Sequence, residues 1–222
     1  MRRFFTRVKA NLFFWLFTAV FTFLFIIVLI YSRQETHLYL NRYHSDFLDT
    51  LMKYWTYLGD GIVALIIVVG LLLVRIRYAL ITLLAYVLSG LGAQGFKHAF
   101  FREFPRPVKY FELHHPDIDL HLVPEVDMYS WYSFPSGHTA TAFALFFALA
   151  LLTKSKGLQI LLFVMALGVG YSRVYLSQHF LMDVVGGASL GMVFAWIAWW
   201  WIGRYENTWM DAPLINGLRK WL

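Results

Sequence analysis

Long apolar runs constrain the fold of this sequence more than any other feature. Hydrophobic residues make up 59% of its 222 residues and charged residues only 14%, whereas globular domains carry about 25% charge. A soluble core could not hide this much apolar surface, but a bilayer can act as its solvent. The first run, residues 12–31, is long enough to span, and no small-residue cleavage site follows it. We therefore interpret it as a membrane helix and not as a cleaved signal peptide.

The hydropathy pattern predicts an all-α protein, a bundle of six transmembrane helices. The expected spans are about 11–31, 54–74, 78–100, 137–152, 158–171 and 183–202. The fourth and fifth spans are shorter than the roughly 20 residues of a full crossing. Short spans are typical of helices that begin below the membrane surface, inside protein, around a sunken site. No second domain is visible, so residues 1–222 are expected to form one domain with a motif-bearing core at about 97–183.

Basic residues predict the orientation of these spans. They precede the first span, separate the second from the third and the fourth from the fifth, and follow the sixth. If the spans alternate, these positions all lie on one side, which is the cytoplasmic side by the positive-inside rule. Both termini are then cytoplasmic in a multi-pass protein of the cell (inner) membrane. The net charge of +6 is explained by helix ends facing anionic lipid, so no nucleic acid partner is expected.

Three polar segments lie at the outer ends of the predicted helices. They are residues 97–107, 134–138 and 172–183. Because separate helices bring them to one membrane face, we expect them to form a single site there. The two long segments on the outer side are residues 32–49 and 102–134. Long loops of this kind are often functional.

The third segment contains the strongest pair. His179 and Asp183 are four residues apart, so on a helix they share a face. The carboxylate can accept the imidazole N–H, which fixes the tautomer and leaves the other nitrogen free as a nucleophile. The guanidinium of Arg173 is suited to phosphate oxygens. A surface ion pair at the start of a helix is the alternative interpretation of this segment.

The second segment, Phe134-Pro135-Ser136-Gly137-His138, precedes an apolar helix. Ser136 is a candidate N-cap, Gly137 allows close backbone approach, and the exposed amides form an anion site. His138 is placed to give a proton to a leaving oxygen. Taken alone, the segment also fits a simply capped helix with a satisfied histidine.

The first segment supplies cations. Lys97 ends a span, where lysines commonly extend to the membrane surface, and Arg106 precedes Pro107. Arg102 and Lys109 are alternatives to Arg106. Together the three segments bring His138, His179, Asp183 and several cations to one face, and these suit phosphoryl transfer without a metal. Neither a carboxylate cluster for magnesium nor a zinc motif is present in the sequence, and no cofactor is expected. The absence of cysteine excludes a thiolate nucleophile.

These segments resemble the motifs of the type 2 phosphatidic acid phosphatase family, which also includes vanadium haloperoxidases and glucose-6-phosphatase. The family pattern is K-x6-R-P, P-S-G-H and S-R-x5-H-x3-D. The second and third parts are complete at 135–138 and 172–183, while the first has eight residues in place of six between Lys97 and Arg106. The resemblance implies that His179 attacks phosphorus, that Asp183 orients the His179 ring and that His138 protonates the leaving oxygen. It also implies phosphate binding by the following residues: Lys97, Arg106, Ser136, Gly137 and Arg173.

The resemblance implies a membrane lipid phosphatase or pyrophosphatase with an outward-facing site and a phosphohistidine intermediate. Expected substrates are undecaprenyl diphosphate, phosphatidylglycerol phosphate or phosphatidic acid, with lipid A phosphate as an alternative. A phosphotransferase using the same site and, in another class, a lipid carrier with a vestigial site are the competing interpretations. Membrane lipids are the expected surroundings, and no protein partner is required.

Overall fold

The computed structural model describes residue 8 and residues 10–218, and the secondary structure of this part is entirely helical. The elements, in chain order, are α2 (Leu12–Ile30), α3 (Arg33–Asn41), α4 (Asp46–Trp55), η1 (Thr56–Gly59), α5 (Gly61–Val74), α6 (Ile76–Phe100), α7 (Pro107–His114), α8 (Gly137–Leu152), α9 (Lys156–Tyr175), α10 (Leu181–Ile202), η2 (Thr208–Asp211) and α11 (Leu214–Leu218). The all-α expectation is confirmed for the described residues.

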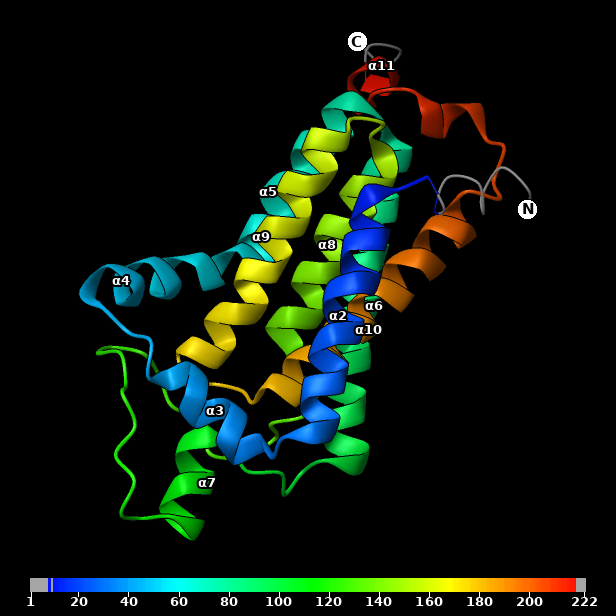
Figure 1. The fold of residues 1–222 in the computed structure, drawn as a ribbon. Coiled ribbons are helices and arrows are strands. Elements are labelled where there is room, and N and C mark those ends of the chain that lie inside the picture. The colour runs from blue at the N-terminus through cyan, green and yellow to red at the C-terminus, as the bar shows by residue number, and fades with distance from the viewer. Residues whose placement is uncertain (1–7, 9, 219–222) are drawn as a thin grey trace.

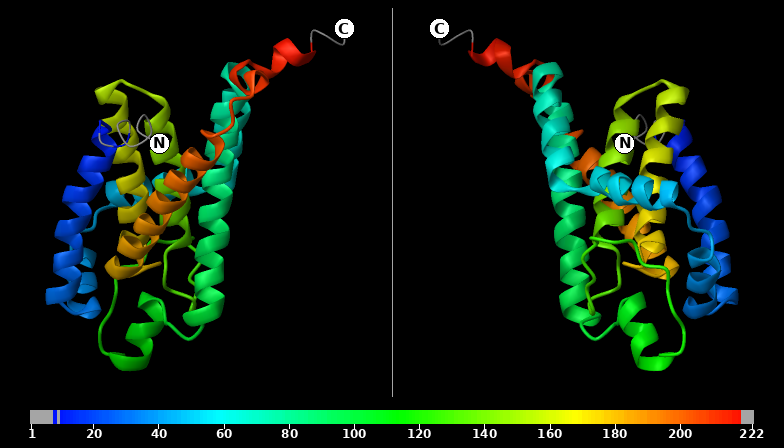
Figure 2. Two further views of the ribbon diagram at one scale, coloured as in Figure 1. Left: turned by 90° about the vertical axis from the view of Figure 1, so that its right-hand side faces the viewer. Right: turned by 90° about the vertical axis from the view of Figure 1, so that its left-hand side faces the viewer.

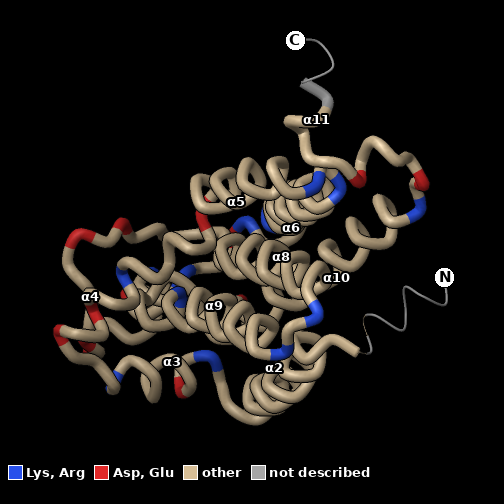
Figure 3. The backbone as a smooth tube through the Cα atoms, turned by 90° about the horizontal axis from the view of Figure 1, so that it is seen from above, with Lys and Arg blue, Asp and Glu red and all other residues tan. Residues whose placement is uncertain are grey.

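Helix α8 occupies the centre of the bundle. Seen end-on, it lies among α5, α6, α9 and α10 (Figure 3). Every residue from Thr139 to Ala148 is buried, which explains why this helix is apolar on all sides and not amphipathic. A helix buried in protein on every face need not be long enough to cross a bilayer. The predicted bounds of this helix, 137–152, are confirmed.

Helix α10 packs closely against α8 through two glycines four residues apart. A Cβ atom on Gly187 would lie 2.4 Å from the carbonyl oxygen of Ser136, and one on Gly191 would lie 2.3 Å from that of Ala140. Neither position can carry a larger side chain without separating the helices. The small-xxx-small spacing of Gly187 and Gly191 therefore reflects close packing inside the bundle.

Four of the described helices are long and apolar enough to cross a membrane: α2, α6, α9 and α10. The pair α4–η1 and α5 passes the same test as one broken span with a bend of 52°. The sequence predicted one span from about residue 54 to residue 74. The structure differs from this prediction, because the helical run is broken and bent before α5. The predicted fifth span, 158–171, is also too short, because α9 extends over 20 residues.

The polar segments gather at one end of the bundle. We call it the site end: α6 and α9 finish there, and α8 and α10 begin there, close to α3 and α7 (Figure 1). The α8–α9 connection and α11 lie at the opposite end, which we call the far end (Figures 1 and 2). Helix directions alone thus bring residues distant in sequence to a common face.

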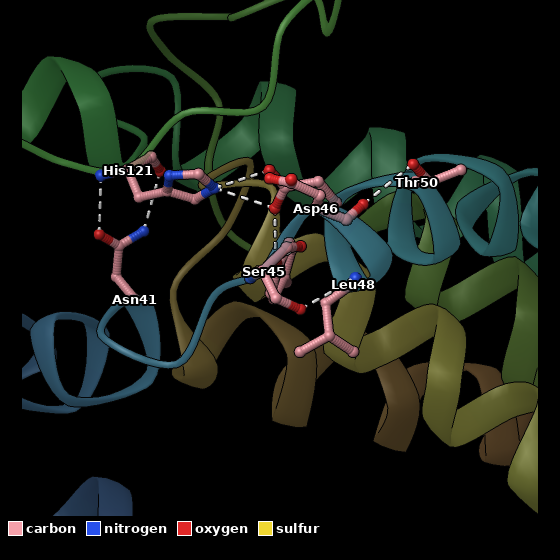
Figure 4. A network of polar contacts seen from close by, with 8 residues as sticks. Asn41, Ser45, Asp46, Leu48, Thr50 and His121 are labelled. Carbon is pink, nitrogen blue, oxygen red and sulfur yellow. Dashed lines mark hydrogen bonds and ion pairs between the residues drawn. The ribbon is translucent and has the colours of Figure 1, made fainter.

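The α7–α8 connection, residues 115–136, is fastened to the helices beneath it. His121 exchanges backbone hydrogen bonds with the side chain of Asn41, at 2.9 and 3.0 Å. Its Nε2 lies 2.9 Å from Asp49 Oδ1, and its ring stacks on that of His44 at 3.9 Å. Figure 4 shows His121 between Asn41 and the start of α4. Together with the ion pair of Lys53 and Glu125 at 2.6 Å, these contacts hold the connection at the site end.

Candidate functional site

The carboxylate of Asp183 organises the start of α10. Its Oδ2 accepts hydrogen bonds from the backbone N–H of Phe180 at 2.9 Å and from Ser133 Oγ at 2.5 Å, and lies 3.4 Å from His179 Nδ1. Asp183 is the third residue of α10, whereas His179 precedes the helix. The two side chains therefore meet across a helix cap, and the expectation that they share a face of one helix is corrected. The predicted contact itself is present.

His179 is a buried imidazole among positive charges. Its side chain is 1% exposed, and its backbone N–H bonds to the carbonyl oxygen of Arg173 at 3.0 Å. Burial, then the nearby charges of Arg106 and Lys97, hold the pKa of His179 well below its usual range. The ring is therefore neutral near pH 7. Since Nδ1 faces Asp183, Nε2 keeps a lone pair directed elsewhere.

Three cations, Lys97, Arg106 and Arg173, lie close enough to this imidazole to lower its pKa, and so does His138. Lys97 is only 5% exposed. It therefore does not extend to the membrane surface, as a lysine at the end of a span commonly does. Arg173 donates through Nη1 to Thr56 Oγ1 at 2.8 Å, while its buried Nε has no hydrogen-bond partner. A buried donor without a partner is costly, and a bound anion would satisfy it.

Of the candidate cations in the first segment, Arg106 lies within the cluster. It donates through Nε to the Trp131 carbonyl oxygen and through Nη1 to Gln178 Oε1, both at 3.1 Å. Burial lowers its pKa. Arg102 instead is exposed and bonds to the carbonyl oxygen of His98. Lys109 pairs with Glu112 at 3.1 Å. Residues 101–106, between α6 and α7, form the turn that separates Lys97 from Arg106.

The start of α8 has the features of an anion site. Ser136 is the N-cap, accepting the backbone N–H of Thr139 at 3.4 Å, as predicted. A Cβ atom on Gly137 would meet no atom within 4 Å, so its backbone borders open space. His138 is partly exposed, and its Nε2 lies 2.8 Å from Asp60 Oδ1. Free amides, a helix N-terminus and an accessible imidazole thus face the same region.

The sequence patterns did not identify four residues of this site: Thr56, Asp60, Ser133 and Gln178. Gln178 Oε1 accepts from both arginines, from Arg106 Nη1 at 3.1 Å and from Arg173 Nη2 at 3.3 Å, and its Nε2 donates to the Asp127 carbonyl oxygen. Asp60 directly precedes an apolar run, and this sequence pattern indicates an ordinary helix N-cap. The position of Gln178, directly before His179, was the only available signal.

The family model of the PAP2 superfamily matches residues 76–206, and the chain belongs to this family. Its apolar helices and this membership make it an integral membrane protein. The resemblance found in the motifs is thereby confirmed.

Several known proteins are similar to the chain. Phosphatidylglycerophosphatase B of Bacillus subtilis (strain 168) is 42% identical over 73 residues, 29% of this chain and 36% of the relative, so the chain aligns with about a third of that relative's length. The lipid A 4'-phosphatase of Bacteroides thetaiotaomicron is 27% identical over 162 residues, 72% of each chain. The crystal structure of Aquifex aeolicus LpxE matches with a TM-score of 0.64 and 28% identity, covering 74% of this chain and 93% of that one.

Proposed function

We propose that the chain is a lipid phosphatase that hydrolyses the phosphomonoester or diphosphate of a membrane lipid through a phosphohistidine intermediate. The observation that carries the proposal is the site around His179: a buried, neutral imidazole that contacts a carboxylate and lies near enough to three cations for their charges to lower its pKa. Neutral nitrogen is the nucleophilic form of histidine, and cations stabilise the charge that develops on a transferred phosphoryl group. The names of the relatives, which include a lipid A phosphatase, support the substrate class.

In the proposed reaction, Nε2 of His179 forms a bond to phosphorus as the bond from phosphorus to the lipid oxygen breaks. The electron pair of that bond stays on the lipid oxygen, which takes a proton from His138. Asp183 accepts the Nδ1–H of His179 and stabilises the positive charge that forms on the ring. Water then attacks phosphorus, with His138 accepting its proton, and the nitrogen–phosphorus bond breaks.

The phosphate-binding roles remain as predicted from the motifs. Lys97, Arg106 and Arg173 neutralise the phosphoryl oxygens, and the unpartnered Nε of Arg173 is a donor available to one of them. Ser136 and the backbone amide of Gly137 bind at the N-terminus of α8, where the helix dipole favours negative charge.

The membrane arrangement that we propose has six spans in a single domain, residues 1–222, with both termini in the cytoplasm and the site end facing outward. The broken pair α4–α5 and the short helix α8 would be the two crossings beyond the four long apolar helices. The basic residues at the far end, such as Arg75 and Lys154, support this orientation in the inner membrane. Phosphate heads at the membrane surface would then meet the site directly.

Phosphate release from a panel of lipid phosphates tests the proposal. The purified protein should release phosphate from at least one of undecaprenyl diphosphate, phosphatidylglycerol phosphate, phosphatidic acid and lipid A, faster than from soluble phosphate esters. His179→Ala should lower the rate by at least about 10⁴-fold, since loss of a nucleophile of this kind costs that much or more. His114→Ala, at an exposed histidine of α7, is the matched control and should keep full activity. Undiminished turnover by His179→Ala would exclude this histidine as the nucleophile.

A further inference from the structure

The break between α4 and α5 brings an additional segment to the site. The turn η1 and Asp60 interrupt the helical run with a bend of 52°, and an interruption in an apolar helix exposes backbone groups that must be satisfied. The carbonyl oxygen of Gly59 accepts from Thr141 Oγ1 at 3.0 Å. Trp55 Nε1 donates to the carbonyl oxygen of Met165 at 3.2 Å. The bend is thus fixed against both α8 and α9.

Two side chains of this bend contact residues of the site. Asp60 Oδ1 lies 2.8 Å from His138 Nε2, and Thr56 Oγ1 accepts from Arg173 at 2.8 Å. Neither belongs to any of the three motifs. Aspartate at a helix N-cap normally bonds to the first free amides of its own helix, but Asp60 makes no such bond to α5. Its carboxylate is directed to the histidine.

We propose that residues 56–60 form a fourth active-site segment, in which Asp60 positions His138 for proton transfer. The carboxylate accepts the Nε2–H, which fixes the ring and its tautomer and leaves Nδ1 for the substrate. As the phosphorus–oxygen bond breaks, the Nδ1 proton passes to the lipid oxygen. Asp60 stays ionised throughout and stabilises the imidazolium that exists before the transfer. The inference rests on the proposed function, since it concerns the acid of that reaction.

The test uses two substrates that differ in their need for an acid. The alkoxide of an alkyl phosphate is a poor leaving group and needs to be protonated as it departs. The p-nitrophenolate of p-nitrophenyl phosphate departs readily without a proton. Because kcat/KM reports the steps up to departure of the leaving group, it isolates the step that Asp60 assists. Asp60→Asn should lower kcat/KM for a lipid alkyl phosphate about 10- to 100-fold, as loss of such supporting groups commonly does, and for p-nitrophenyl phosphate less than about 3-fold, since that leaving group makes little use of general acid catalysis.

A double-mutant cycle distinguishes positioning from a general structural role. In a His138→Ala background, Asp60→Asn should have no further effect, because the residue through which it acts is gone. Tyr54→Phe, at an exposed side chain of α4 just before this segment, is the matched control and should match the wild type. Asp60→Ser, with thermal unfolding of each variant, covers the case in which Asp60→Asn does not fold.

Equal losses for both substrates, a loss that persists without His138, or no loss at all would each overturn the assignment of Asp60. These outcomes are separate from failure of the proposed function. If the wild type released no phosphate from any substrate, the function itself would be wrong. If it released phosphate and the Asp60 variants did so equally well, only the fourth segment would be rejected.

Discussion

A single amide, that of Gln178, joins the two arginines of the site to the α7–α8 connection. Because its Oε1 accepts from both guanidinium groups, Gln178→Leu leaves both without this acceptor. Hydrogen bonds to charged groups contribute about 1.5–3 kcal/mol, so kcat/KM for a lipid phosphate should fall about 10- to 100-fold. Steady-state kinetics measures this, with Gln34→Leu on α3 as the matched control. A change below about 2-fold would mean that the arginines hold their positions without Gln178.

At the residue scale, the motif residues could be predicted but their partners could not. The contact of His179 with Asp183 follows from their four-residue spacing, and His138 was singled out by the motif before a predicted helix. Asp60 lies 78 residues before His138 in the printed sequence, and nothing in the local pattern separates it from a helix cap. Only the fold, by bending the chain before α5, brings the two together.

Helix α3 is attached to the site through a fully buried histidine. His37 is 0% exposed, its Nε2 lies 3.2 Å from Ser177 Oγ, and its ring packs against Phe180. Burial lowers its pKa to about 4, whereas in the unfolded chain it is near 6.5. The unfolded state therefore binds a proton first as the pH falls.

The consequence is a loss of stability between about pH 6.5 and pH 4. Above this window both states are neutral at His37, and below it both are protonated, so the change lies between. The full loss is about 3 kcal/mol. Thermal unfolding in detergent at several pH values measures it. His37→Leu should have a flatter pH dependence than the wild type, whereas His114→Leu should keep the wild-type curve. An unchanged slope in His37→Leu would contradict the role given to this residue.

At the element scale, the helices were predictable where hydropathy decides and not where contacts decide. The bounds of α8 follow from its apolar composition and the preceding cap. The bend at η1 does not: the segment Gly59-Asp60-Gly61 has the pattern of an ordinary helix start before an apolar run, and this pattern does not specify how sharply the chain turns. Contacts with α8 and α9 stabilise that bend, and contacts of this kind have no local sequence signature.

At the scale of the whole molecule, the proposed outward orientation depends on charges distributed over both ends. The charge pattern predicts which end is cytoplasmic, while the fold fixes which residues share an end. Asp117 is exposed in the α7–α8 connection at the site end, and Lys154 is exposed in the α8–α9 connection at the far end. A correct topology must place these two positions on opposite sides of the membrane.

Because the sequence contains no cysteine, single cysteines can be added without removing others. In spheroplasts, Asp117→Cys should react with a membrane-impermeant maleimide, while Lys154→Cys should react only after permeabilisation. The unaltered chain is the control and should remain unlabelled. The reverse pattern would place the site in the cytoplasm, and labelling of both positions before permeabilisation would contradict an odd number of crossings between them. Either result would require the substrate to approach from another face, since the helix directions leave the phosphate site at one end only.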